Sequence, residues 1–165
     1  MTATLEPTAG PPTWTDANTV GATITIDARP EVVWPVIADL GDIQAFHPGV
    51  RRSAYISDSK EGVGAARVCE FGGGRSVEEH AIEWEEGRSF TLELKNGRGM
   101  PPFKRALATM SVRPDGDRTQ VDMELRYTLR FGLIGKLMDR MVRPQFERML
   151  PAVLGGLKKQ LEAST

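Results

Sequence analysis

The sequence has few of the side chains that hold a protein together through covalent or metal bonds. Its 165 residues include one cysteine and two histidines, so no disulfide can form within the chain. Cys69, His47 and His80 lie in three separate segments, an arrangement that excludes the usual closed zinc site. We therefore expect a domain held by a hydrophobic core, with neither a metal nor any other cofactor.

An excess of charge of one sign is also missing, as are long apolar runs. The 21 basic and 22 acidic side chains give a formal net charge of −1. This balance argues against nucleic acid as a partner, because a general binder needs spare basic residues to neutralise phosphates. The longest apolar stretches, residues 32–38 and 149–157, are much shorter than the roughly 20 residues that span a bilayer. We expect no integral membrane segment.

The first residues differ in composition from the rest. Residues 1–18 are rich in Thr, Ala, Pro and Gly, and they lack the basic start and apolar run of a signal peptide. We expect them to form a disordered tail and the protein to be cytoplasmic. Residues 19–163 are numerous enough to bury a core of their own, so we expect a single domain there.

Two short helices are expected after a first strand. Residues 20–28 alternate apolar with small or polar side chains, the period of a half-buried strand. Residues 30–39 begin with a proline suited to a first helical position and carry apolar side chains at three-to-four spacing. A second short helix covers residues 42–46 and is ended by a His-Pro-Gly sequence.

A run of antiparallel strands follows, separated by glycine-rich turns. In the last of them, apolar residues occupy one face and polar residues the other throughout, so one face should be packed and the other wet. We expect these further strands at residues 50–57, 64–71, 75–85, 88–95, 105–112 and 118–131.

The carboxyl-terminal segment has the pattern of a long helix. Its apolar residues recur at three-to-four spacing from Leu137 to Leu161. We expect Pro144 to separate a short entry helix from the long one and Pro151 to kink the latter. Gly155-Gly156 should allow another backbone to approach closely. One sheet with one wet face must wrap its apolar face around this helix, which defines an α+β fold.

Four segments of the chain carry a family resemblance: Ile-Asp-Ala-Arg-Pro-Glu-Val-Val-Trp from residue 26, Phe-His-Pro-Gly-Val from 46, Gly-Ala-Ala-Arg-Val from 64 and Glu-His-Ala-Ile-Glu-Trp from 79. With the order of elements, they resemble the START-like or SRPBCC superfamily, and within it the bacterial polyketide cyclase/dehydrase branch. The resemblance implies a helix-grip (START/Bet v 1-like) fold, in which a curved seven-stranded antiparallel sheet wraps around the long terminal helix. Arg29 departs from the family, which more often has a small capping residue there.

The resemblance also implies a deep apolar cavity that binds a small hydrophobic, oxygenated molecule of polyketide or lipid type. Three functions stay open at this point. The protein could catalyse cofactor-free cyclisation or dehydration by proton transfer, or it could be a non-catalytic carrier or sensor of a lipid, isoprenoid or quinone. The third alternative is a protein interaction module, and an acyl carrier or a weak homodimer is among the partners considered.

The candidate catalytic residues are His47, Glu79 and Tyr127. His47 could act as a general acid or base or donate to a ligand oxygen, or it could be a turn histidine bonded to a nearby carbonyl. Glu79 and Arg67 should form a salt bridge, because buried charges are rarely tolerated unpaired; alternatively the pair fixes a ligand carboxylate or enolate. Tyr127 could protonate an alkoxide, or simply find a hydrogen-bond partner.

The expected ligand contacts are the side chains that should face inward from the sheet and from the last helix. For the strand at residues 75–85, two interpretations of which side chains face inward stay open. The resemblance turns Val77, Glu79 and Ala81 inward, whereas hydrophobicity favours Ile82 and Trp84; a bulge near Ala81 would reconcile them. The full set of expected ligand contacts is Phe46, Arg67, Cys69, Phe71, Phe90, Leu92, Met123, Leu125, Met141, Phe146, Met149 and Leu150.

Two further features have both functional and ordinary interpretations. The loops at residues 72–76 and 96–102 resemble the flaps that cover the cavity mouth in this fold. Basic residues gather around the start of the last helix, from Arg126 to Arg148. They form either a solvated face or a surface that attracts anionic ligands, acyl carriers or a membrane.

Overall fold

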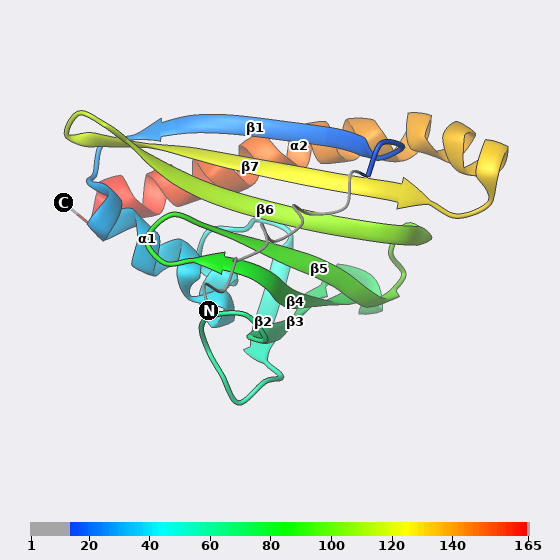
Figure 1. Ribbon diagram of the computed structural model, residues 1–165, viewed down its shortest axis with the longest axis horizontal. Helices are drawn as coiled ribbons and strands as arrows, with labels where there is room; N and C mark the ends of the chain where they lie inside the picture. Colours follow the sequence, from blue (N-terminus) through cyan, green and yellow to red (C-terminus); the bar gives the residue numbers. More distant parts are fainter. Residues whose placement is uncertain (1–13, 165) are drawn as a thin grey trace, which may run out of the picture.

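The computed structural model describes residues 14–164 (Figure 1). Its centre is one curved antiparallel sheet of seven strands in the order β1-β7-β6-β5-β4-β3-β2. The expected order of a strand, two short helices, six strands and a terminal helix is confirmed. The elements are β1 (Asn18–Ile26), α1 (Pro30–Ala38), η1 (Leu40–Ala45), β2 (Val50–Tyr55), β3 (Ala66–Phe71), η2 (Gly72–Gly74), β4 (Ser76–Glu85), β5 (Ser89–Arg98), β6 (Phe103–Asp115), β7 (Arg118–Leu129) and α2 (Gly132–Ala163).

The long helix α2 packs along β1 and β7 and reaches η1 at its far end (Figure 1). Two of its basic side chains bind the edge strand β1. The Nζ of Lys158 donates to the carbonyl of Thr25 at 2.9 Å, and Nη2 of Arg143 donates to the carbonyl of Thr19 at 2.9 Å. The sheet therefore grips the helix as the helix-grip fold requires.

The helix α2 is continuous from Gly132 to Ala163, and both Pro144 and Pro151 lie inside it. The expectation that Pro144 separates a short entry helix was wrong. A proline in a helix interior costs about 3 kcal/mol. Burial of apolar side chains against the sheet outweighs that local cost. The buried apolar residues of α2 are Phe146, Leu150, Val153, Leu154, Leu157 and Leu161.

The contact between α2 and the end of η1 depends on one glycine. A Cβ atom added at Gly156 would lie 2.1 Å from the carbonyl oxygen of Phe46, whereas one added at Gly155 would meet nothing within 4 Å. The close backbone approach expected for this pair is therefore made by Gly156. It fixes the position of the chain just before His47.

A bulge determines which side chains of β4 face the core. Its pairing with β5 shifts register between Ala81 and Glu83. Before the bulge, Val77 and Ala81 are buried; after it, Trp84 also faces the core and stacks on Phe90, with ring centroids 5.4 Å apart. The bulge thus allows both Ala81 and Trp84 to face inward, as expected, but Ile82, which hydrophobicity also favoured, lines a surface pocket with Trp14 and Arg126.

The expected tail lies partly outside the described residues, since these begin at Trp14. The ring of Trp14 lies against the guanidinium groups of Arg105 and Arg126, at 5.0 and 5.7 Å. Arg126 also donates to the carbonyl of Trp14 at 3.2 Å.

Within residues 14–164, no helix combines the length and the apolar character that crossing a bilayer requires.

Candidate functional site: an apolar cavity with a polar end

A cavity of about 290 Å³ lies between the sheet and α2. It is found where two hydrophobic clusters meet, and Leu94, Met123 and Met149 pack against both clusters. All three of these side chains also line the cavity. The volume is close to the lower end of the range of roughly 300–1,000 Å³ that is usual for small-molecule sites.

Most of the residues expected to contact a ligand line this cavity. Their side chains come from β3, β5, β7 and α2, so elements distant in sequence converge on one space. His47 and Glu79 also reach the wall. The expected contacts that line the cavity are Arg67, Phe71, Phe90, Leu92, Met123, Leu125, Phe146, Met149 and Leu150.

Three expected contacts lie elsewhere. Phe46 is buried, but at the junction with Gly156, where its carbonyl faces the helix. Cys69 is 1% exposed and contacts Glu79 from outside the cavity wall. Met141 is 75% exposed. It lies on the solvent side of α2, since its neighbours Asp139 and Arg143 bond to Tyr127 of β7 and Thr19 of β1.

Tyr127 also lies outside the cavity, although its side chain is fully buried. Its hydroxyl donates to Oδ1 of Asp139 on α2. Its ring packs edge-to-face behind Phe103 and Phe146, which line the cavity. Burial, together with the Asp139 carboxylate, raises the pKa of Tyr127 far above its ordinary value. This geometry makes Tyr127 a link between β7 and α2 and places no hydroxyl in the cavity.

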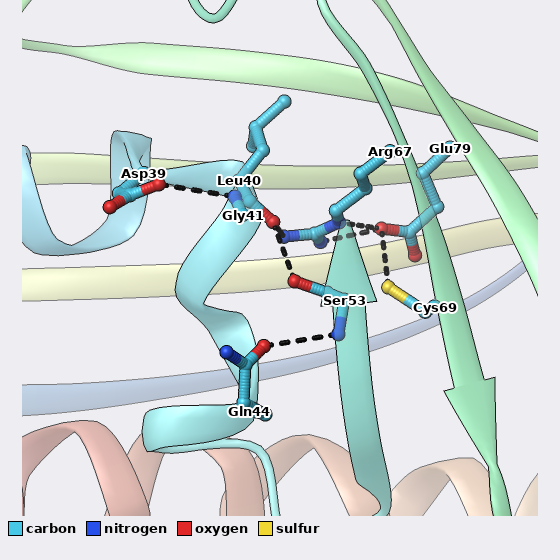
Figure 2. A network of polar contacts seen from close by, with 8 residues as sticks. All are labelled: Asp39, Leu40, Gly41, Gln44, Ser53, Arg67, Cys69 and Glu79. Atoms are coloured by element: carbon cyan, nitrogen blue, oxygen red, sulfur yellow. Dashed lines mark hydrogen bonds and ion pairs between the residues drawn. The ribbon is translucent and has the colours of Figure 1, made fainter. Parts of the chain in front are cut away.

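The polar end of the cavity is built around Arg67 and Glu79, which are direct cross-strand partners on β3 and β4 (Figure 2). Nε and Nη2 of Arg67 each lie 2.5 Å from Oε2 of Glu79. The expected salt bridge is therefore confirmed. Burial alone would lower the pKa of Arg67, but the carboxylate of Glu79 raises it above the ordinary value.

The same arginine holds η1 on the sheet. Nη1 of Arg67 donates to the carbonyl of Leu40 at 2.9 Å, and the hydroxyl of Ser53 donates to the same carbonyl at 3.1 Å. The side chain of Gln44 accepts from the amide of Ser53 at 3.2 Å (Figure 2). These bonds dock η1 against β2 and β3, and so determine where His47, two residues beyond η1, enters the cavity wall.

The contacts to Glu79 converge on one of its two oxygens. Oε2 accepts from Arg67 and, at 3.7 Å, from the thiol of Cys69. Oε1 has no donor among residues 14–164, and the residue lines the cavity. Burial raises the pKa of the Cys69 thiol far above its ordinary range, so Cys69 is a neutral donor and no nucleophile. The free oxygen of Glu79 is available to a ligand.

His47 is 7% exposed, and its ring has one nitrogen already engaged. Nδ1 accepts a hydrogen bond from the amide of Gly49 at 3.0 Å. Burial lowers the pKa of His47 below its ordinary value, partly offset by the charge of Glu79. The ring is therefore neutral near pH 7 with its proton on Nε2. It can donate to a ligand oxygen, but it cannot accept a proton at Nδ1 without losing the Gly49 bond.

Several lining residues were not expected from the sequence. The two loops compared with flaps contribute part of the cavity wall, through Arg75, Gly99, Met100 and Pro101. Arg75 packs against Gly99, where an added Cβ would lie 2.7 Å from the Cγ of Arg75. The glycine and proline content of these loops is the feature of the sequence that could have identified them as part of the site.

No group of three or more metal-ligating side chains gathers among the described residues.

Comparison with known proteins assigns the chain to a family. Residues 18–162 match the family described as polyketide cyclase/dehydrase and lipid transport. The protein belongs to this family, and so to the START-like (SRPBCC) superfamily. No curated protein matches the sequence.

Solved structures share the fold at low sequence identity. The Zhui aromatase/cyclase of a Streptomyces strain superposes with a TM-score of 0.74 at 18% identity, covering 88% of this chain and 94% of that one. A START superfamily protein of Mycobacterium smegmatis gives 0.69 at 14% identity, covering 89% and 99%. Norcoclaurine synthase of Thalictrum flavum, in complex with dopamine and hydroxybenzaldehyde, gives 0.69 at 16% identity, covering 90% and 88%. These likenesses show the helix-grip fold.

Proposed function

We propose that the protein binds a small hydrophobic molecule that carries a carbonyl or hydroxyl oxygen, with that oxygen at the His47 and Glu79 end of the cavity. One observation carries the proposal. Most of the cavity lining is apolar, and His47, Arg67 and Glu79 lie close together in its wall; Arg75 and Gln145 are the other polar side chains that line it. An apolar pocket with a few convergent polar groups is the usual form of a small-molecule site.

The two polar groups offer a ligand complementary bonds. Nε2–H of His47 is a donor, and Oε1 of Glu79 is an acceptor whose charge is held in place by Arg67. A hydroxyl could donate to Oε1 while a carbonyl on the same molecule accepts from Nε2–H. The family membership and the cyclase named among the similar structures support a ligand of polyketide type.

The binding is tested with 2-naphthol, an oxygenated aromatic whose fluorescence reports on its surroundings. We expect saturable binding by the wild type, and binding about tenfold weaker after His47→Phe or Glu79→Gln. His80→Phe and Glu78→Gln are the matched controls, because these side chains pair with each other outside the cavity. Equal affinity of His47→Phe and the wild type would contradict the proposed orientation.

Catalysis is the second candidate function, and the unengaged Oε1 of Glu79 favours it. A carboxylate oxygen can remove a proton next to a ketone while Nε2–H of His47 stabilises the developing enolate oxygen. Attack of the enolate carbon on a second carbonyl would then close a ring, and the alkoxide formed would take back the proton held by Glu79, so that no cofactor is needed. The alternative that remains is a carrier, which binds the same molecule and leaves it unchanged.

An experiment with 4-hydroxyacetophenone in deuterium oxide distinguishes catalysis by proton transfer from non-catalytic ligand transport. An enzyme of this kind exchanges the methyl protons of the probe for deuterium, which nuclear magnetic resonance follows. We expect Glu79→Gln to abolish the exchange and Glu78→Gln to keep it. Binding of the probe without any acceleration of exchange would identify a carrier.

A further inference from the structure

The start of α2 presents a cluster of apolar side chains to solvent. Each is more than half exposed, which is unusual for large apolar residues that lie close together. The other exposed large apolar residues of the described chain, Val32, Ile56 and Val63, lie on other elements. We call the cluster the helix-entry patch, and it consists of Phe131 (64% exposed), Leu133 (82%), Ile134 (64%), Leu137 (63%) and Met141 (75%).

The exposed charges among these turns are all basic. Arg130, Lys136 and Arg140 are exposed. The acidic residue in the same stretch, Asp139, has a side chain only 16% exposed and accepts the hydroxyl of Tyr127. The surface around the helix-entry patch is therefore apolar with a basic rim. Such a rim complements an anionic partner, whereas a two-fold contact between copies of this chain would bring the same cations together.

The helix-entry patch adjoins a groove that borders the cavity. An open groove is lined by Arg130 and Phe131 and by residues of the loop at 99–102, and it shares Met100 and Phe103 with the cavity wall. The backbone of Arg130 donates to the carbonyl of Pro102 at 2.9 Å. Its side chain donates to the carbonyl of Phe103 at 3.1 Å. The turn just before α2 is thus bonded to the end of the loop that forms part of the cavity wall.

We infer that the helix-entry patch docks on the surface of an anionic lipid bilayer, so that the groove opens toward the membrane and a hydrophobic ligand passes between the bilayer and the cavity. The docking itself follows from the patch and its basic rim. The passage of a ligand rests on the proposed function. Apolar side chains such as Leu133 would enter the boundary between headgroups and acyl chains, and the basic rim would lie among anionic headgroups.

Docking is tested by co-sedimentation of the full chain with vesicles. We expect binding to vesicles of phosphatidylglycerol and phosphatidylcholine in equal parts, and binding about tenfold weaker to phosphatidylcholine alone. Added salt should weaken the binding to anionic vesicles, because it screens the basic rim. Leu133→Glu combined with Leu137→Glu should lower the affinity at least tenfold, and Lys136→Glu with Arg140→Glu should remove the preference for anionic lipid.

Val63→Glu is the matched control, because Val63 is 66% exposed and lies in the loop between β2 and β3. It should bind vesicles as the wild type does. The inference is overturned if the wild type does not sediment with anionic vesicles, or if the Leu133→Glu, Leu137→Glu variant binds them equally well. It is also overturned if ultracentrifugation shows a dimer that this variant dissociates, since a second copy would then cover the patch. Titration with 2-naphthol in the absence of vesicles tests ligand binding in the cavity independently of membrane docking.

Discussion

Arg67 and Glu79 face each other across β3 and β4, and two nitrogens of the arginine lie 2.5 Å from the same oxygen of the glutamate. Their side chains are 5% and 13% exposed. The pair therefore combines a structural task with a functional one. Arg67 ties η1 to the sheet through the carbonyl of Leu40, and it holds the charge of Glu79 at the cavity wall.

Removal of Arg67 should destabilise the protein strongly. Arg67→Met leaves the Glu79 carboxylate without its buried partner, and loss of one member of a buried pair typically costs about 3–5 kcal/mol. Urea denaturation measures the loss in the free energy of unfolding. Arg52→Met is the control, since Arg52 and Glu70 are exposed and 4.0 Å apart, and it should cost less than about 1 kcal/mol. A loss below about 1 kcal/mol for Arg67→Met would contradict this account of the pair.

His47 should make the protein less stable in mild acid. Its pKa in the folded state is lower than its ordinary value, which is about 6.5 in an unfolded chain. As the pH falls through that value, the unfolded chain binds a proton that the folded protein does not, so the free energy of unfolding decreases; above it the residue has no effect. Denaturation at a series of pH values should show a steeper loss in the wild type than in His47→Phe.

A direct titration checks the same point. The ring proton signals of His47 and His80 can be followed by nuclear magnetic resonance as the pH is changed. The account predicts a midpoint for His47 below the ordinary value for histidine. A midpoint at or above that value would mean that the folded protein binds the proton readily, and the assignment of Nε2–H as a neutral donor would be wrong.

Two neighbouring glycines of α2 should respond in opposite directions to the same substitution. Gly156→Ala places a methyl group against the Phe46 carbonyl, and such overpacking costs roughly 1–3 kcal/mol. Gly155→Ala meets open space and should stabilise the helix by about 0.5–1 kcal/mol. Thermal denaturation of both variants measures this. Equal melting temperatures would show that α2 does not approach Phe46 as closely as the structure has it.

Tyr127→Phe should affect stability and leave the cavity chemistry unchanged. The variant removes the bond to Asp139 and leaves that carboxylate without its donor, at a cost of roughly 1–3 kcal/mol. Affinity for 2-naphthol should change by less than about twofold, because the hydroxyl does not line the cavity. A loss of binding or exchange activity at unchanged stability would show that Tyr127 takes part in ligand binding or catalysis.

Local patterns in the sequence were enough for most of the fold. The strict alternation in β7 fixed which face is packed, because a strand points successive side chains to opposite faces. A sequence pattern could not show that α2 runs through Pro144, since the burial that outweighs the proline depends on the sheet beneath it. Met141 was placed at the cavity because three-to-four spacing identifies apolar positions on a helix, but not which side of the first turns lies on the sheet.

The site was predictable where it depends on neighbouring strands. Arg67 and Glu79 could be paired from the strand order alone. The partners of Arg67 and His47 on the backbone, the carbonyl of Leu40 and the amide of Gly49, leave no trace in side-chain patterns. The bond from Tyr127 to Asp139 also stayed hidden, because it depends on how the chain turns between β7 and α2.

The central claim is that an oxygenated hydrophobic molecule occupies the cavity, and methionine methyl groups test it most directly. Met100, Met110, Met123 and Met149 line the cavity, whereas Met141 is exposed on α2. Nuclear magnetic resonance of the protein labelled at its methionine methyl groups can be recorded during titration with 2-naphthol. The account predicts shifts for the four lining methionines and none for Met141; unchanged lining signals at saturation, or a shift of Met141 alone, would contradict it.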